Sequence, residues 1–320
     1  MGKIGLHQIK DTEDIFIVPK SAAAHNAFYR GKDLTSYFDS GDMSKAIANG
    51  TFEDIYPGDY ITKSVTIDGT AYENVKFVVG DLDYYYLMGS TSLTTHHVLM
   101  IPDSVIGVAP MNLPVDKTTT TTHEKTDTDK EGTVTETCGD LTITTVTTIS
   151  GSTTTVKVTK KSRNGHYTYG GYAGSNMWQV TMPKYATGLT DAFGAGHLVK
   201  HQVLLSNAVN VDLKSNADDA WMCAAVGNCL TWYDVTCNLM NEMQVCGSLI
   251  WTSSAGEVRS MNHQIAAFRH SNDLQNAHRR DYWLTAVAVS ASFAPSWCTG
   301  EAGGDGAGSS LGVRPYFLLR

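Results

Sequence analysis

Threonine dominates one stretch of the chain and limits what that stretch can form. Residues 118–159 contain 19 threonines in 42 positions. The first part, "TTTTTHEKTDTDKEG", is polar and predicts a loose segment. The second part alternates β-branched apolar and polar residues on both sides of a turn at Gly151, which suits a pleated, half-exposed surface.

We therefore expect a Thr-rich β-hairpin arm, inserted at residues 118–164, that projects from the main body. A low-complexity linker between two domains is the alternative interpretation of the same composition. The alternation on both sides of the turn favours the hairpin, because a linker needs no period of two residues.

The rest of the chain predicts short strands, a few helices and many loops. Pro57-Gly58 and Asp68-Gly69 are turn signals between β-rich runs. Apolar spacing between Met177 and Leu189 indicates a helix, with Pro183 near its start or at a kink. This mixture predicts an α+β fold with an irregular, loop-rich body.

Three parts follow from this pattern. Residues 1–50, with short helices that end at Gly50, form an N-terminal segment for attachment or oligomerisation. Residues 51–117 and 165–320 form one domain, which the arm at 118–164 interrupts.

Two apolar runs lie on either side of a glycine-rich stretch in the last forty residues. Tyr282–Val289 alternates as a strand that is buried on at least one face. Gly312–Leu319 predicts a second strand that pairs with it and closes the domain. Within the second run, the Arg314 side chain can donate hydrogen bonds to several loop carbonyls at once.

The segment between these runs, Ser290–Leu311, is rich in Gly, Ala and Ser and has little charge. A loop held at both ends by core strands suits recognition, and an exposed tryptophan such as Trp297 suits an anchor. The alternative is that Phe293 and Trp297 fill a small second core. The candidate ligand-binding residues are Ser290, Ser292, Pro295, Trp297, Thr299, Glu301, Asp305 and Ser309.

Charge and hydropathy exclude some classes of partner. The formal net charge is −8, which argues against a broad basic face for nucleic acid. No stretch approaches 18 apolar residues, and the N-terminus lacks the apolar core of a signal peptide. We expect a protein made in a cytoplasm, with no membrane insertion and no nucleic-acid partner.

Catalytic and metal motifs are weak. The six cysteines form no CxxC pair, so we expect reduced thiols, although a disulfide stays open. His96 and His97 are adjacent on an expected strand and point to opposite faces, so isolated exposed histidines are favoured over a metal site. "GGDGAG" lacks the Lys-Ser/Thr ending of a phosphate loop. We expect no catalytic residues, no metal and no cofactor.

Several pieces of the chain resemble a known family. "DYWLTAV", a small-residue loop and "GVRPYFLL" are similar to the C-terminal signature of C-type-lectin-like domains in bacteria and their phages. Formylglycine-generating enzymes and phage receptor-binding variable proteins, such as the major tropism determinant, share that scaffold. "GTFEDIYPGDYIT", "TTHHVLMIPD" and "GGYAGSNMWQVTMPKYATGL" extend the resemblance to virion proteins. Together the matching pieces cover about residues 50–112 and 169–320.

The resemblance implies a C-type-lectin-like fold and a place on a phage virion, as a head fibre, a capsid decoration or a tail-tip protein. It implies that the C-terminal loop binds a host cell-surface receptor, a protein or a glycan. The arm would contact a neighbouring subunit or another virion protein, within a homo-oligomer that is a trimer or a dimer.

The rival hypothesis is a purely structural decoration protein without a ligand. An enzyme of the same fold is the least favoured, because Cys298 stands alone where formylglycine-generating enzymes have paired cysteines. The sugar-binding motifs of calcium-dependent lectins, Glu-Pro-Asn and Trp-Asn-Asp, are missing from the sequence as well.

Overall fold

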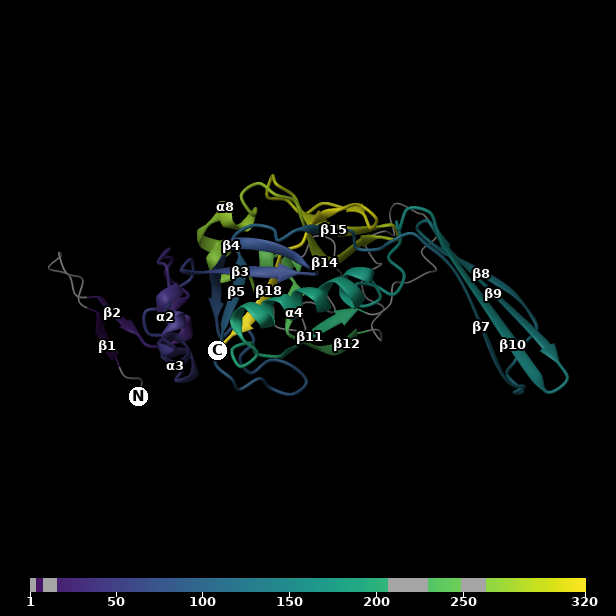
Figure 1. Cartoon of the computed structure of the whole chain (residues 1–320), viewed down its shortest axis with the longest axis horizontal. Coiled ribbons are helices and arrows are strands. Elements are labelled where there is room, and N and C mark those ends of the chain that lie inside the picture. Colours follow the sequence, from purple (N-terminus) through teal and green to yellow (C-terminus); the bar gives the residue numbers. More distant parts are fainter. Residues whose placement is uncertain (1–3, 8–15, 207–229, 249–262) are drawn as a thin grey trace.

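The structure, a computed structural model, describes residues 4–7, 16–206, 230–248 and 263–320. Over these ranges the chain is mixed α+β and rich in strands, most of them antiparallel, which confirms the predicted class (Figure 1). No helix in the described ranges is long and apolar enough to cross a membrane.

One five-stranded sheet has the order β13-β18-β5-β4-β3. A two-residue turn at Asp68-Gly69 joins β3 to β4, with φ values of 50° and 80°. Positive φ at both positions is what this tight hairpin needs, so the turn signal in the sequence is confirmed. The strands are β3 (Tyr60–Ile67), β4 (Thr70–Leu82), β5 (Val98–Pro102), β13 (Cys237–Leu239) and β18 (Pro315–Leu319).

The second five-stranded sheet has the order β16-β15-β14-β17-β6. The predicted pairing of the two C-terminal runs is wrong for most of their length. Only Tyr282 pairs with Gly312, in parallel, whereas β18 pairs with β5 and β13 in the other sheet. The chain passes from one sheet to the other at Val313 and Arg314. The strands are β6 (Val108–Ala109), β14 (Tyr282–Val289), β15 (Ser292–Ser296), β16 (Asp305–Gly306) and β17 (Leu311–Gly312).

The main helix covers β3. A π-helix, η1 (Met177–Thr181), leads into α4 (Met182–Phe193), with Pro183 in its first turn, as the sequence predicted. Gly188 permits close packing, because a Cβ there would lie 2.3 Å from the carbonyl oxygen of Thr66. The remaining elements of the body are β11 (His201–Ser206), β12 (Leu230–Val235), α5 (Glu242–Cys246), α7 (Ala266–His270) and α8 (Asn272–Gln275).

The Thr-rich insertion is a four-stranded antiparallel sheet in the order β7-β10-β9-β8, which projects from one end of the body (Figure 1). The sequence predicted a single hairpin. That hairpin exists as β9 and β10, but two further strands flank it. The strands are β7 (Val115–Glu124), β8 (Gly132–Cys138), β9 (Leu141–Ser150) and β10 (Thr153–Ser162).

The polar run that was expected to be loose is therefore a strand up to Glu124. It pairs with β10 over ten residues, from Val115 opposite Ser162 to Glu124 opposite Thr153. Threonine is β-branched and fits a sheet even where both neighbours are threonine, so the absence of apolar alternation was misleading there.

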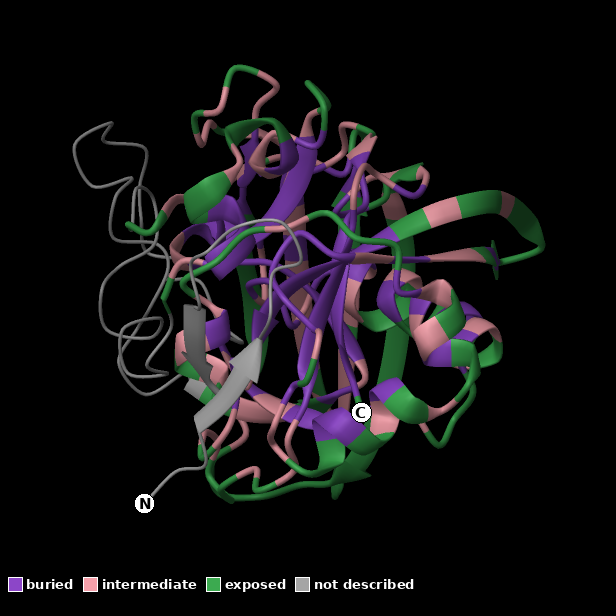
Figure 2. Cartoon of the chain, turned by 90° about the vertical axis from the view of Figure 1, so that its left-hand side faces the viewer, coloured by how far each residue is buried: buried purple, intermediate pink, exposed green. Residues whose placement is uncertain are grey.

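Helices of the N-terminal segment pack with the body. A short hairpin, β1 (Ile4–His7) and β2 (Phe16–Pro19), precedes α1 (Ala22–His25), α2 (Thr35–Asp39) and α3 (Asp42–Ala48). Leu34, Phe38, Met43 and Ile47 are buried in the same hydrophobic cluster as both large sheets. The chain from Leu34 onward is thus part of the body rather than a separate attachment segment. Figure 2 shows the buried residues gathered in the centre of that body.

Candidate functional site

The C-terminal candidate segment is folded into strands rather than left as an open loop. β14 is buried on both faces along almost its whole length, and it turns at Ser290 into β15. β15 then pairs with β16, so that residues 282–306 form an antiparallel meander. Phe293 and Ala294 are wholly buried in β15, which explains why this part of the segment is a strand.

The turn between β15 and β16, residues 297–304, is the most exposed part of the meander. The amide of Trp297 donates to the carbonyl of Glu301 at 2.8 Å, and the amide of Gly300 donates back to Trp297 at 2.8 Å. The side chains of Thr299 and Glu301 are exposed and lie 3.4 Å apart, Oγ1 to Oε1. Backbone hydrogen bonds therefore hold the turn while its polar side chains face outward.

Trp297 is half-buried and does not project freely. Its indole lies against Gly303, where a Cβ would come within 1.6 Å of Nε1. The indole Nε1 is buried and has no hydrogen-bond partner in the described part of the chain. Trp297 therefore fits neither interpretation of the sequence fully: its indole packs inside the turn, and the residue as a whole is still partly exposed.

A second set of polar candidate residues lies at the end of the meander opposite the turn at residues 297–304. Asp305 Oδ1 accepts from the amide of Gly306 at 2.6 Å and from Ser309 Oγ at 2.8 Å. Ser292 pairs with Gly306, next to Asp305 in β16. All three candidate side chains are partly buried, and Asp305 is engaged in holding its own loop.

Ser290 joins the meander to the base of the arm. Its carbonyl accepts from Cys138 Sγ at 3.3 Å, from the amide of Thr168 at 3.1 Å and from Thr168 Oγ1 at 3.0 Å. The ring of His166 lies against Gly306, whose Cβ would meet it at 2.9 Å. Sequence reasoning missed this junction, because its members come from three distant parts of the chain.

Pro295 must be removed from the candidate set. It is buried in β15, and its carbonyl accepts from the amide of Gly303 at 3.1 Å. The structure thus places the other seven candidates in three separate locations. Trp297, Thr299 and Glu301 share the turn, Ser292, Asp305 and Ser309 lie at the far end, and Ser290 belongs to the arm base.

The cysteine thiols in the described ranges show little that suggests reaction chemistry. Four cysteines in the described ranges are unpaired: Cys138, Cys237, Cys246 and Cys298. Cys223 and Cys229 lie outside those ranges. A hydrogen bond to Asp281 raises the pKa of the Cys298 thiol, and burial raises the pKa of Cys237 to about 12. Both changes reduce the thiolate that a nucleophile or a metal ligand needs.

His97 corrects one expectation, since it is wholly buried rather than exposed. Its Nε2 accepts from the amide of Tyr85 at 3.0 Å, while His96 Nδ1 pairs with Asp83 at 2.7 Å. Among the described residues no cluster of three or more His, Cys, Asp or Glu side chains could hold a metal ion.

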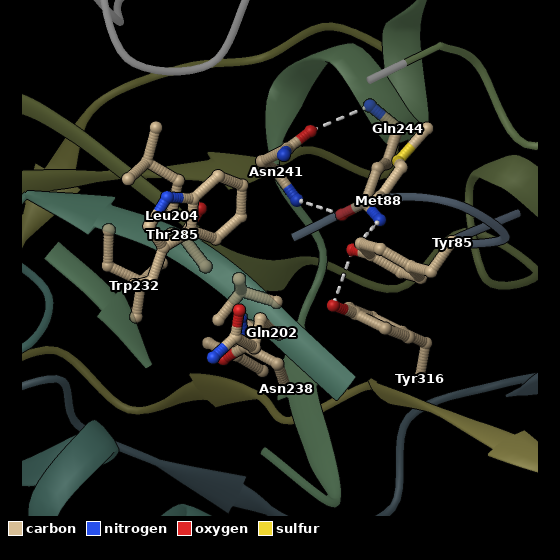
Figure 3. Close-up of a pocket in the computed structure, with 13 residues that line it drawn as sticks. Tyr85, Met88, Gln202, Leu204, Trp232, Asn238, Asn241, Gln244, Thr285 and Tyr316 are labelled. Atoms are coloured by element: carbon tan, nitrogen blue, oxygen red, sulfur yellow. Dashed lines mark hydrogen bonds between the residues drawn. The ribbon is translucent and has the colours of Figure 1, made fainter. Parts of the chain in front are cut away.

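A buried polar cavity lies beneath β11 and β12 (Figure 3). Tyr85 and Tyr316 meet there at 2.6 Å between their hydroxyl oxygens, and Gln244 Nε2 donates to Tyr85 at 2.9 Å. His201 Nε2 lies 3.1 Å from the Tyr316 hydroxyl. The cavity has a volume of about 20 Å³. This is room for about one water molecule, so the network is structural rather than a ligand site.

An open groove of ligand size lies between η1–α4 and β12–β13, and the sequence did not predict it. Its volume is about 320 Å³, and its walls include Trp178, Met182, Pro183 and Asp234. Trp178 packs edge-on against Tyr233 with ring centroids 5.5 Å apart. An aromatic wall with a few polar groups is a common composition for small-molecule sites.

The exposed turn remains the part of the candidate segment best suited to contact another molecule. Buried strands hold it on one side and the arm base fixes the opposite end of the meander. No protein-family model, curated protein or solved structure matches this chain.

Proposed function

We propose that this protein is a phage virion surface protein with a C-type-lectin-like domain, and that it presents the turn at residues 297–304 to a molecule on the host cell surface. The resemblance of the C-terminal block to phage receptor-binding proteins supports the family. The turn supports the role, since exposed Thr299 and Glu301 directly follow the buried strand β15 and lie in a turn closed by backbone hydrogen bonds.

The single observation that carries this proposal is the contrast between β14 and the turn. Seven of the eight residues of β14 are buried, whereas Thr299, Glu301 and Gly304 are exposed in the turn that follows β15. A rigid base with an exposed polar tip keeps the tip ordered before binding, which lowers the entropic cost of recognition. The receptor would be a protein or a glycan, and weak single contacts would be offset by several copies on one particle.

Substitution of the exposed tip tests the proposal. The double variant Thr299→Lys/Glu301→Lys changes size and charge at two exposed side chains and should leave the melting temperature nearly unchanged. Adsorption of the purified protein to whole cells of the host bacterium should fall by about tenfold or more. Asn49→Lys, at an exposed position after α3, is the control for a lysine introduced elsewhere on the surface and should adsorb as the parent does.

Unchanged adsorption of the double variant would reject host recognition by this turn. If the protein were still found on purified particles, the purely structural decoration role would then replace the receptor-binding role.

A further inference from the structure

The groove between η1–α4 and β12–β13 has a helix on one side and a strand edge on the other. The helical wall repeats every fourth residue, with Trp178, Met182 and Ala186 on one face. The opposite wall consists of four consecutive residues, 234–237, so this segment borders the groove with its edge rather than with one face. Figure 1 shows α4 beside β11 and β12.

The two walls contact each other at two points. Trp178 packs edge-on against Tyr233 with ring centroids 5.5 Å apart, and Cys237 Sγ donates to the carbonyl of Met182 at 3.8 Å. The space that they border has a volume of about 320 Å³, which is the size of a small-molecule site. A small molecule therefore fits better than a peptide strand, which would have to pass between walls that are already in contact.

The helical wall begins with an uncommon local structure. In the π-helix η1 the amide of Met182 donates to the carbonyl of Met177, five residues back. Pro183 follows and has no N–H, so the carbonyls of this turn have one donor fewer. Single π-helical turns are rare and occur often at functional sites. This observation is independent of the volume of the groove and marks the same wall.

The groove is acidic. Among the described residues that line it, Asp234 is the one side chain that is charged at neutral pH. Asp234 is exposed, and it forms no ion pair with any residue in the described ranges. Lys184, the residue after Pro183, is paired with Asp68 at 2.6 Å. A carboxylate without a basic partner thus lies across the groove from an aromatic wall.

The start of the helix does not offer a site for an anion. The amides of residues 176–178 donate to Asn112 Oδ1, the Met111 carbonyl and Ser175 Oγ, at 3.0, 3.0 and 3.1 Å. The N–H groups that attract anions at helix starts are therefore used within the protein. Gln179 Nε2 likewise donates to a backbone carbonyl at 3.3 Å, which leaves its Oε1 as an acceptor.

We propose that this groove binds a small organic cation, with the charged group at Asp234 and an apolar body against Trp178 and Met182. An aromatic ring attracts a cation through the negative face of its π-system, and a carboxylate adds an ion pair. A guanidinium fits better than an ammonium, because it is planar, stacks on aromatic rings and is more weakly hydrated. The groove shares no residue with the turn at 297–304, so the inference goes beyond the proposed function and does not depend on it.

Two probes of the same shape test the charge in the purified full-length protein. Benzylguanidinium carries a cation, and benzylurea is its neutral counterpart. In NMR titrations at low ionic strength, benzylguanidinium should bind with a dissociation constant on the order of 1 mM, about fivefold or more tighter than benzylurea.

Removal of the carboxylate tests the role of Asp234. Asp234→Asn keeps the shape of the side chain, and it should weaken binding of benzylguanidinium by about fivefold or more while changing that of benzylurea by less than about twofold. Asp191→Asn is the matched control, since it removes the same charge from an exposed position on α4 outside the groove. It should change the binding of either probe by less than about twofold.

The indole signals of the tryptophans report where the probe lies. The signal of Trp178 is the one that Trp178→Phe removes, and the signal of Trp297 is assigned in the same way. Benzylguanidinium should shift the signal of Trp178 and leave that of Trp297, in the turn, in place.

Equal affinity for the two probes, or an affinity for benzylguanidinium that Asp234→Asn leaves intact, would overturn the proposal. No binding at ten times the expected dissociation constant, or an unshifted Trp178 signal at saturation, would do the same. None of these measurements uses host cells, so a failure here is distinguishable from a failure of receptor binding by the turn.

Discussion

The guanidinium of Arg314 donates from Nη1 to the carbonyl of Gln275 at 3.1 Å, which joins the entry of β18 to the end of α8. The same side chain donates from Nε to Pro102 at 3.0 Å and from Nη2 to Asp103 at 3.2 Å. Arg314 is 0% exposed. One side chain thus satisfies three carbonyls at the point where the chain crosses between the two large sheets, which removes the cost of leaving those carbonyls unpaired.

Arg314→Lys should therefore destabilise the protein strongly. Burial lowers the pKa of Arg314, and its charge is tolerated because the carbonyls and the flanking rings of Phe268 and Tyr282 surround it. A lysine keeps the charge but cannot reach three carbonyls in a fixed plane, so we expect a loss of about 3 kcal/mol or more in the free energy of unfolding.

Urea unfolding at neutral pH measures this loss. Arg320→Lys is the matched control, since Arg320 is exposed and donates from Nε to the carbonyl of Gly196. It should change the free energy of unfolding by no more than about 0.5 kcal/mol. Equal effects for the two substitutions would contradict the role given to Arg314.

Two glycines of the arm with the same positive φ should respond very differently to alanine. Gly139 and Gly151 both have φ of 60°. A Cβ at Gly139 would lie 2.1 Å from the carbonyl oxygen of His166 and 2.8 Å from that of Ser290, whereas a Cβ at Gly151 meets nothing within 4 Å. Gly151→Ala should add only the backbone strain of about 1 kcal/mol, and Gly139→Ala should also separate the arm base from the meander.

Hydrogen exchange separates these outcomes residue by residue. In Gly139→Ala the amides around Thr168 and Ser290 should exchange faster, while the body keeps its protection. In Gly151→Ala any increase should stay at the outer end of β9 and β10. Faster exchange at Thr168 in both variants would show that the arm base is not held by the contact at Gly139.

Local turn chemistry was the part of the fold most readable from the sequence. Asp68-Gly69 and Gly151 lie between alternating runs, and both turns appear where expected, because the positive φ that they need is set within a few residues. The helix around Pro183 was predictable as well, because its apolar spacing and its proline are also local signals. These features depend little on distant parts of the chain.

Strand partners could not be predicted in the same way. No residue in or near Pro315–Leu319 indicates that β18 pairs with β5 and β13 rather than with β14. The threonine run at β7 gives no alternation, and only its pairing with β10 reveals it as a strand. Both errors concern contacts between residues far apart in the sequence, for which a single sequence contains no signal.

The candidate site shows the same division between local features, which the sequence indicates, and contacts between distant residues, which it does not. Thr299 and Glu301 were named as ligand-binding candidates because they lie in a segment rich in Gly, Ala and Ser, and both side chains are exposed. Pro295 is buried because β15 continues farther than a glycine- and serine-rich segment suggests, and the junction of Ser290 with Cys138 and Thr168 depends on the arm folding back onto the meander.

The loop at the outer end of the arm should lose order when Asp129 is changed to Asn. Asp129 accepts from the amide of Thr126 at 2.8 Å, from Thr154 Oγ1 at 2.8 Å and from His123 Nε2 at 3.2 Å. These hydrogen bonds, first that from Thr126, hold the pKa of Asp129 well below its usual range. In Asp129→Asn the amides of residues 123–131 should exchange faster, with the melting temperature of the body unchanged. A fall in that melting temperature would mean that the loop is coupled to the body.

Acid should destabilise the protein through His201. Burial, with a smaller effect of His97, lowers the pKa of His201 to about 3, although the Val199 carbonyl opposes the change. The unfolded chain binds this proton with an ordinary histidine pKa near 6.5. Between about pH 6.5 and pH 3 the unfolded state therefore holds more protons than the folded state, so stability is lost as the pH falls through this window.

From pH 7 to pH 5 this single group should lower the free energy of unfolding by about 2 kcal/mol. His201→Gln should remove that part of the pH dependence, whatever it does to stability at pH 7, because glutamine does not titrate. His270→Gln, at an exposed position on α7, should keep the full dependence of the parent. Urea unfolding of the three proteins at both pH values measures the difference, and an unchanged dependence in His201→Gln would show that His201 is not the group responsible.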